Sequence, residues 1–255
     1  MTRVVVAGAF GRMGSLLSRM IAGSDRLDLV GGVDIRAGEQ FGAPVVEPTG
    51  LAGLLEEVRP DVLVDFTVAP AAVQNIRTAA EHGVALVVGT TGFSSEQEAA
   101  NRNAIEGRVP AVISTNFSIG VNIFWQLLRE AAPRLADYDI EVIEAHHRYK
   151  KDAPSGTAKT ILSILDQAVG AREKKYGREG MEERGREIGV HVVRGGDIVG
   201  DHAVLFAGNF ETITLSHRAY DRAVFATGAL RAVEWVPGRP AGVHTFAEVL
   251  GLESR

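Results

Sequence analysis

The most informative feature of the sequence is the regular alternation, over its first half, of short apolar segments with longer amphipathic ones. The apolar segments lie at 4–7, 27–33, 61–66, 84–88 and 109–113, and the amphipathic ones at 11–22, 51–58, 70–82 and 94–105. Short, continuously apolar strands are typical of a parallel sheet that is buried on both faces, and the amphipathic segments between them supply the helices that cover it. We therefore predict an α/β domain built on a doubly wound parallel sheet.

The pattern changes after residue 116. Helical spacing recurs at 121–132 and 155–168 around a strand at 139–145, and a polar segment follows at 172–189. Strand-like segments at 190–194, 203–207 and 210–217 are separated by short glycine turns, and a last helix is predicted at 222–236. Strands joined by such turns indicate an antiparallel or mixed sheet. We predict a second, smaller α+β domain over 117–227, beside a first domain made of 1–116 and 228–255.

Composition narrows the class of protein. The 255 residues carry a formal charge of −5 and no cysteine, which excludes a fold stapled by disulfides. An acidic chain lacks the basic face that displaces counterions from nucleic acid, so we expect no nucleic-acid partner. No apolar run approaches the ~18 residues of a membrane span, and the first residues lack the charged and long apolar segments of a secretory signal. We expect a cytoplasmic protein with no membrane partner.

A glycine-rich loop, GAFGRMG at 8–14, stands between the first predicted strand and the first predicted helix. Glycine reaches positive φ and lets phosphates approach the backbone, and the helix that follows presents N–H groups and the positive end of its dipole to a pyrophosphate. The spacing is G-x-x-G-x-x-G rather than G-x-G-x-x-G. We predict a Rossmann-type dinucleotide site, and the alternative that these glycines only allow close helix–sheet packing stays open.

Other polar groups fall where a dinucleotide would lie. Asp34 ends the second predicted strand, about 20 residues past the loop, where a carboxylate bonds ribose hydroxyls. An acid there disfavours a 2′-phosphate, although Arg36 could offset that charge. The loops at 89–92 and 114–117 follow two further strands at the same sheet edge, and Thr115 and Asn116 could bond a nicotinamide carboxamide. The alternatives are an ordinary strand-end turn for Asp34 and a plain capped loop at 89–92.

The second half carries a basic cluster that stands out in an acidic chain. Residues 146–151 (HHRYKK) precede Pro-Ser-Gly-Thr and a helix, whose first N–H groups, at Gly156 and Thr157, form an anion site. Cations beside a helix amino terminus suit a small dicarboxylate, and histidine or lysine can supply a proton. His146 and His147 line one pocket only if the strand ends there, because successive strand residues point to opposite faces. A solvated basic turn is the alternative, and no metal site is expected, since no paired carboxylates stand at ligand spacing.

Six segments carry a resemblance to a known family. They are GAFGRMG (8–14), VDFT (64–67), VGTTGF (88–93), NFSIGVN (116–122), EAHHRYKKDAPSGTA (144–158) and RGGDIVGDH (194–202). In this order they resemble the 4-hydroxy-tetrahydrodipicolinate reductases, also called dihydrodipicolinate reductases, over nearly the whole chain. The fifth segment is highly specific, and the glycine loop is much less so.

The resemblance implies a reaction and a set of site residues. The reaction is NAD(P)H-dependent reduction of 4-hydroxy-2,3,4,5-tetrahydrodipicolinate to 2,3,4,5-tetrahydrodipicolinate, with loss of water, in diaminopimelate and lysine synthesis. It also implies a homotetramer assembled through the second-domain sheet and a carboxy-terminal segment that returns to the nucleotide domain. His146 and Lys150 match the family's proton donors, and His147, Lys150 and the amides of Gly156 and Thr157 match its contacts to substrate carboxylates. The residues that would bind NADH or NADPH are Gly8, Ala9, Phe10, Gly11, Arg12, Met13, Asp34, Gly89, Thr90, Thr91, Ser114, Thr115, Asn116 and Phe117.

Three positions depart from the family pattern. Ile35 stands where many relatives have an arginine, which leaves the choice between NADH and NADPH open, Tyr149 replaces a common histidine, and Thr115 stands where alanine or proline is usual. Two other functions stay open on the sequence alone: another two-domain dehydrogenase, and a module that senses a dinucleotide without catalysis. A semialdehyde-type reductase would need a nucleophilic cysteine, which this chain lacks. A sensor leaves the pairing of HHRYKK with PSGT unexplained.

Overall fold

The computed structural model, which describes residues 1–252, divides the chain into two compact units. The first comprises Met1–Ser118 and the chain from Ala223 onward, and the second is Ile119–Arg222. The sequence placed the two crossings after residue 116 and before residue 228. The second crossing comes earlier because helix α7 (Ala223–Trp235) is continuous and belongs as a whole to the first unit.

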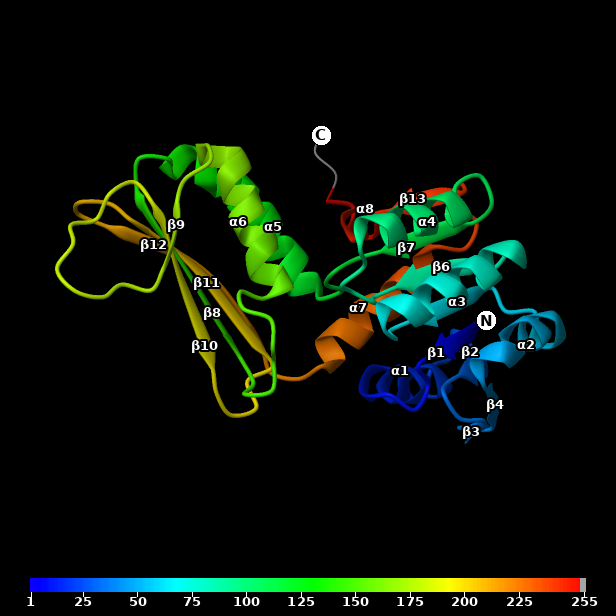
Figure 1. Ribbon diagram of the computed structural model, residues 1–255. Helices are drawn as coiled ribbons and strands as arrows, with labels where there is room; N and C mark the ends of the chain where they lie inside the picture. The colour runs from blue at the N-terminus through cyan, green and yellow to red at the C-terminus, as the bar shows by residue number, and fades with distance from the viewer. Residues whose placement is uncertain (253–255) are drawn as a thin grey trace. The chain divides into compact units, whose positions relative to one another are not determined.

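Within the described residues, an eight-stranded sheet forms the centre of the first unit (Figure 1). Every strand pair in it is parallel except β3 with β4, and the strand order reverses at β1, which lies between β2 and β5. The predicted doubly wound parallel sheet is therefore confirmed. Its strands are β1 (Thr2–Ala7), β2 (Leu27–Val33), β3 (Gly38–Gln40), β4 (Ala43–Val46), β5 (Val62–Asp65), β6 (Ala85–Val88), β7 (Pro110–Ile113) and β13 (Gly242–His244), in the order β13-β7-β6-β5-β1-β2-β4-β3.

Helices cover both faces of this sheet (Figure 1). On one face lie η1 (Pro48–Gly50), α2 (Leu51–Val58), α3 (Ala69–Glu81) and α4 (Ser95–Ile105), and α1 (Arg12–Ala22) and α7 pack beside each other on the opposite face, with α8 (Phe246–Leu250) against α7. Fully buried residues from both layers, such as Val5, Leu63 and Ile76, form the core. Capping also sets the helix bounds: the Ser94 hydroxyl accepts from the Gln97 amide at the start of α4.

The second unit is built on a mixed sheet, as predicted. Among the described residues it has five strands in the order β12-β11-β8-β10-β9, with antiparallel pairs on the β12 side of β8 and parallel pairs on the β9 side. The strands are β8 (Asp139–His146), β9 (Lys174–Tyr176), β10 (Ile188–Arg194), β11 (Gly200–Ala207) and β12 (Thr212–Ala219). Helices α5 (Ile119–Ala131) and α6 (Gly156–Val169) lie side by side on one face, with η2 (Ala132–Leu135) after α5 (Figure 1).

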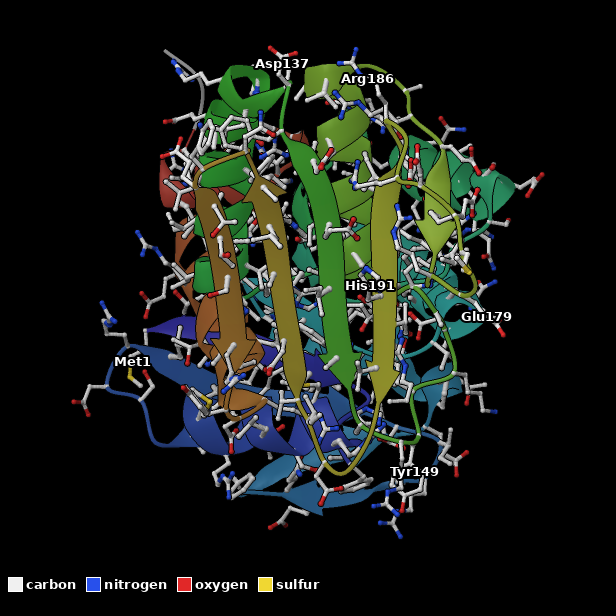
Figure 2. The ribbon with its side chains drawn as sticks, turned by 90° about the vertical axis from the view of Figure 1, so that its left-hand side faces the viewer. Met1, Asp137, Tyr149, Glu179, Arg186 and His191 are labelled. Carbon is white, nitrogen blue, oxygen red and sulfur yellow. The ribbon has the colours of Figure 1, made fainter. Side chains whose placement is uncertain are left out.

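The two faces of this second sheet differ. Alternate residues of β8 and β11, such as Val142 and Val204, are buried under α5 and α6, and the residues between them point the other way. Figure 2 shows that outer face, with His191 on it, Asp137 and Arg186 at one end of the sheet and Tyr149 at the other. The end marked by Tyr149 is where β8 finishes, and there the basic cluster begins.

The carboxy-terminal segment returns to the first unit. Strand β13 pairs in parallel with β7 and adds the edge strand of the eight-stranded sheet. The predicted return of this segment is confirmed. Over residues 1–252, no helix is both long and apolar enough to cross a membrane.

Candidate functional site

The glycine loop after β1 makes a tight turn at the point where the strand order reverses. Gly8 has a φ of +76°, and the amides of Gly8 and Ala9 both donate to the Val33 carbonyl, at 2.8 and 3.1 Å. Gly14 lies so close beneath the loop that a Cβ there would stand 1.9 Å from the Gly8 carbonyl oxygen. The first glycine therefore allows the turn and the third allows close helix packing, and these two roles coexist at a switch point, where ligands bind in such sheets.

Helix α1 opens directly onto this loop. Its N-cap is Gly11, whose amide donates to the Gly8 carbonyl at 2.9 Å, and Arg12 and Met13 are its first two residues. Their N–H groups point out of the amino end of the helix, and the first turn holds no acidic side chain. The loop and the helix dipole thus form a cradle that suits a pyrophosphate, and a Cβ at Gly14 would displace the loop backbone that shapes it.

Asp34 lies immediately after β2 and touches the same loop. Its Oδ2 accepts from the Phe10 amide at 2.8 Å, and its Oδ1 accepts from the Ile35 amide at 2.7 Å. The guanidinium of Arg36 stands 4.8 Å from the centre of the Phe10 ring. A carboxylate and a guanidinium therefore both lie beside Phe10. The carboxylate would repel the 2′-phosphate of NADPH and the guanidinium would attract it, so the structure favours neither cofactor.

The loop after β6 gives its two threonines different surroundings. The Thr90 hydroxyl is buried and donates to Asp65 Oδ1 at 2.8 Å, whereas Thr91 is exposed. Asp65, fully buried at the end of β5, also accepts from Thr67 and from the Asn75 amide nitrogen, at 2.7 and 2.8 Å. The side chain of Thr90 thus ties the loop to β5, and Gly89 and Thr91 remain beside it at the sheet edge. Asp65 lies within the VDFT segment, and its role in holding this loop was not predicted from the sequence.

The loop after β7 folds as a compact polar turn. The Ser114 hydroxyl donates to the Asn116 carbonyl at 2.9 Å, and Asn116 Oδ1 accepts from the Ser118 amide at 2.8 Å. Thr115 is exposed at the tip of this turn. These residues stand at the same carboxyl edge as the loops after β1, β2 and β6, because the strands that carry them are parallel.

Phe117 lies differently from the other predicted cofactor residues. Its ring is buried, with its centre 5.8 Å from that of Phe66 and 5.0 Å from that of Phe246. It therefore belongs to the core of the first unit, and its position supports the turn rather than presenting the ring at the edge.

In the second unit, the candidate site is centred on the last residues of β8. This strand ends at His146, so His147 leaves it, which meets the condition for both histidines to reach one pocket. Glu144 and His146 are two positions apart and point to the same face, where both are buried. Glu144 Oε2 lies 2.6 Å from His146 Nδ1.

The neighbouring strand and the start of α6 complete the surroundings of Glu144. Arg194 stands beside His146 in the parallel register of β10, and its two Nη atoms donate to both carboxylate oxygens at 2.8 and 2.9 Å. The Ser155 amide donates to Glu144 Oε1 at 2.9 Å. Burial alone would raise the pKa of Glu144, but the bonds from His146, Arg194 and Ser155 outweigh it and lower that pKa from 4.5 to about 2. The carboxylate is therefore ionised at any physiological pH.

A second buried histidine flanks the pair from the other side. His202 of β11 stands opposite Glu144, and its ring lies edge-on to that of His146 with centres 5.1 Å apart. The Ser155 hydroxyl accepts from the Ala158 amide and lies within hydrogen-bond distance, 3.3 Å, of His202 Nε2. Burial, and then the charge of His146, lower the pKa of His202 to about 3, which leaves it neutral.

Lys150 belongs to the loop between β8 and α6. Its Nζ lies 2.9 Å from Asp152 Oδ1, and the Asp152 carbonyl accepts from Arg194 Nη2 at 2.6 Å. The turn that carries Lys150 closes with its amide donating to the His147 carbonyl at 3.1 Å. Although burial opposes it, the Lys150 contact lowers the pKa of Asp152. Arg194 thus connects the loop that carries Lys150 to the carboxylate that holds His146.

Helix α6 begins at Gly156, with Ser155 as its N-cap and Thr157 as its second residue. The N–H groups of Gly156 and Thr157 therefore point out of its amino end, next to Ser155, which binds Glu144. Two imidazoles, an ammonium group and a helix amino end are gathered within this unit. In the described part of the chain, no cluster of three or more metal-binding side chains occurs.

Comparison with known proteins decides the family. The family model described as dihydrodipicolinate reductase, N-terminus, matches residues 2–117, and the one described as dihydrodipicolinate reductase, C-terminus, matches residues 120–250. The chain belongs to the dihydrodipicolinate reductase family. The resemblance drawn from the six sequence segments is therefore confirmed, and with it an NAD(P)H-dependent oxidoreductase of diaminopimelate and lysine synthesis.

Individual relatives of the dihydrodipicolinate reductase family agree along the full length. The 4-hydroxy-tetrahydrodipicolinate reductase of Methanoregula boonei is 64% identical over 253 residues, covering 99% of both chains. That of Methanosarcina barkeri is 51% identical and covers 99% of this chain and 100% of the relative. A solved dipicolinate-bound dihydrodipicolinate reductase from Paenisporosarcina superposes with a TM-score of 0.81 at 25% identity, over 97% of this chain and 98% of the other.

The sequence analysis missed four residues of the second-unit cluster: Glu144, Ser155, Arg194 and His202. All four stood within quoted segments but received no role. One signal was available, since Glu144 and His146 alternate along a predicted strand and so share a face. The contacts of Arg194 and His202 depend on strand register and carried no local signal.

Proposed function

We propose that the second unit binds 4-hydroxy-2,3,4,5-tetrahydrodipicolinate and that His146 donates the proton that accompanies its reduction to 2,3,4,5-tetrahydrodipicolinate. One observation carries the proposal. His146, the loop bearing Lys150 and the amino end of α6 are joined through Arg194 and the buried Glu144 into one hydrogen-bonded network. A solvated basic turn would not be tied to a fully buried carboxylate. The network therefore favours a substrate-binding site over a solvated basic turn.

The substrate is a dianion, and the proposed contacts match it. One carboxylate would meet the Gly156 and Thr157 amides, where the helix dipole favours negative charge. The other would meet Lys150 and His147, which lie on the loop that leaves β8. The Lys150 ammonium already lies 2.9 Å from Asp152 Oδ1, so the substrate carboxylate would share the ammonium with Asp152 or displace Asp152 from it.

The first unit is proposed to hold the cofactor at the sheet edge. The loop at 8–13 would cradle the pyrophosphate, Asp34 would receive ribose hydroxyls, and the loops at 89–91 and 114–117 would flank the nicotinamide end. The Thr90 hydroxyl and the Phe117 ring would act by shaping their loops, since both are buried. Bound NAD(P)H would supply a hydride to the electron-poor carbon of the conjugated imine that forms as the substrate loses water.

His146 would then complete the reaction. Hydride addition builds electron density next to the reduced carbon, and a proton must quench it. His146 is the candidate donor because histidine carries a transferable proton near neutral pH. Lys150 would assist and would offset carboxylate charge. The protein works, in this proposal, in the cytoplasm, where reduced nicotinamide cofactors are available.

The test is turnover with the product of dihydrodipicolinate synthase as substrate, followed by loss of reduced-nicotinamide absorbance. NADH and NADPH are assayed in parallel, because Asp34 and Arg36 favour different cofactors. His146→Gln should lower kcat by about 100-fold or more with less than about a twofold change in NADH affinity. Near-normal turnover of that variant would remove His146 from the mechanism. Pyridine-2,6-dicarboxylate should bind the wild-type protein, and no response to it would favour a sensor.

We further propose that four copies assemble through the outer face of the second sheet. No described residue of the second unit forms a helix on that face, and it carries exposed apolar side chains, among them Ile143 and Val193, 40% and 47% exposed. Val193→Lys should therefore convert a species of four 27.2 kDa chains to smaller ones in size-exclusion chromatography with light scattering. An unchanged mass would place the assembly surface elsewhere.

A further inference from the structure

We infer that Glu144 is a positioning residue: it fixes His146 with Nδ1 protonated, so that Nε2 is the nitrogen that exchanges the proton with substrate, and the absence of a side chain at Gly200 keeps Nε2 accessible. The inference rests on the proposed role of His146 as proton donor.

The hydrogen-bond pattern around Glu144 determines which nitrogen carries a proton. An ionised carboxylate only accepts hydrogen bonds, and Oε2 lies 2.6 Å from His146 Nδ1. Nδ1 must therefore be the donor, in both the neutral and the charged imidazole. Arg194 on both oxygens and the Ser155 amide on Oε1 keep the carboxylate ionised and immobile, so this choice does not change during turnover.

The surroundings of Nε2 point the same way. Among residues 1–252, His146 Nε2 has no hydrogen-bond partner. It is nevertheless not one of the polar atoms that are fully buried without a partner. It therefore reaches the solvent although the whole residue is only 8% exposed. A Cβ at Gly200, the first residue of β11, would stand 3.2 Å from Nε2. The absence of a side chain at Gly200 thus leaves space beside Nε2.

The other titratable and charged groups around His146 also favour Nε2 as the nitrogen that exchanges the proton. Glu144 is the anion in direct contact with the ring, and Arg194 of β10 is neutralised by its two bonds to Glu144. His202 of β11 packs edge-on against the ring and is uncharged. Lys150 is held by Asp152 on the loop that follows β8. The Glu144 carboxylate behind Nδ1 favours the protonated ring, so that Nε2 carries a proton to give, and the cations toward the loop favour the binding of an anionic substrate.

The experiment compares Glu144→Gln with a control, Glu56→Gln. Glu56 lies on α2 in the first unit and also meets a histidine, with Oε1 3.6 Å from His82 Nε2, but it is exposed and belongs to no proposed site. A glutamine at 144 can bond Nδ1 in either sense and carries no charge, so we expect kcat to fall at least tenfold with the KM for NADH changed less than about twofold. The upper pH limit of turnover should also move at least about one unit lower, because a neighbouring anion favours the imidazolium. Glu56→Gln should change neither.

Nitrogen NMR of the histidine side chains reads the tautomer directly. In the wild type, the neutral form of His146, assigned by comparison with His146→Gln, should carry its proton on Nδ1, and in Glu144→Gln part of it should move to Nε2. Glu144→Asp, which keeps the charge, should recover most of the pH limit. An unmoved pH limit together with an unchanged tautomer in a folded Glu144→Gln protein would overturn the inference.

Gly200→Ala tests the open nitrogen without touching Glu144 or Arg194, and it keeps the inference testable if Glu144→Gln does not fold. We expect a kcat at least about fivefold lower, with the Nδ1-protonated form retained in the spectrum. Wild-type turnover of Gly200→Ala would contradict Nε2 as the working atom. The proposed function fails separately: it is His146→Gln with normal turnover that removes the donor, whereas an impaired His146→Gln beside a normal Glu144→Gln rejects only the positioning role.

Discussion

The buried His202 gives the second unit a specific sensitivity to mild acid. Its pKa falls from 6.5 in an unfolded chain to about 3 in the native protein, because burial and the charge of His146 disfavour its protonated form. Between those two values the unfolded state binds a proton that the native state does not, so the free energy of unfolding decreases as the pH falls. From pH 7.5 to 5.0 this one residue should remove about 2 kcal/mol of stability.

The assay is urea unfolding at pH 7.5, 6.0 and 5.0 of the parent and of His202→Gln, whose side-chain amide can still hydrogen-bond with the Ser155 hydroxyl in either direction. Both carry Trp235→Phe, which leaves Trp125, buried in α5, as the fluorescent reporter of the second unit. At or above pH 5.0 the titration of Glu144 does not affect the comparison, since its pKa is 4.5 in the unfolded chain and about 2 in the native protein. The parent should lose about 2 kcal/mol more than His202→Gln over this range. Parallel losses in the two proteins would refute a buried, neutral His202.

Three further predictions test other parts of the structure. Gly14→Ala should weaken NADH binding at least tenfold, measured by nicotinamide fluorescence, because its Cβ would collide with the Gly8 carbonyl at 1.9 Å; unchanged affinity would mean that the loop does not hold the cofactor. Asp152→Asn should tighten pyridine-2,6-dicarboxylate binding about two- to fivefold in calorimetry, since it removes a carboxylate that competes for Lys150 in a partly exposed ion pair, and weaker binding would show instead that Asp152 helps to hold the ligand. Asp65→Asn should lower the free energy of unfolding by about 2 kcal/mol, seen as a lower melting temperature, because a buried carboxylate with four hydrogen bonds loses its charge; an unchanged melting temperature would contradict that role.

The sequence predicted the layers of the fold well and its shortest elements poorly. The strands at the centre of the first sheet are short, continuous apolar runs such as Val4–Val5–Val6, whose length and β-branched side chains favour buried strands. Strands β3, β9 and β13 have three residues each, are at most half-buried, and owe their conformation to a neighbouring strand rather than to their own pattern. Such elements carry no periodicity to detect.

The candidate site likewise has a part that could be predicted from local sequence and a part that could not. His146, Lys150 and the start of α6 stand together in one continuous segment, so local sequence sufficed to group them. Arg194 lies 50 residues from Glu144 along the chain and reaches it only through the register of β10 on β8. The ring of Phe117 is buried beside Phe66 and Phe246, because an aromatic ring gains much from burial, and the contact of this residue with the cofactor stays a prediction.

The late position of β13 has a consequence for synthesis. The β7 edge to which it pairs is translated more than a hundred residues earlier, with the whole second unit between them. A nascent chain can therefore fold its second unit before β13, the edge strand of the eight-stranded sheet, has been synthesised. A ribosome that stalls before Gly242 would release a protein whose β7 is an open edge, a surface that invites association with other chains.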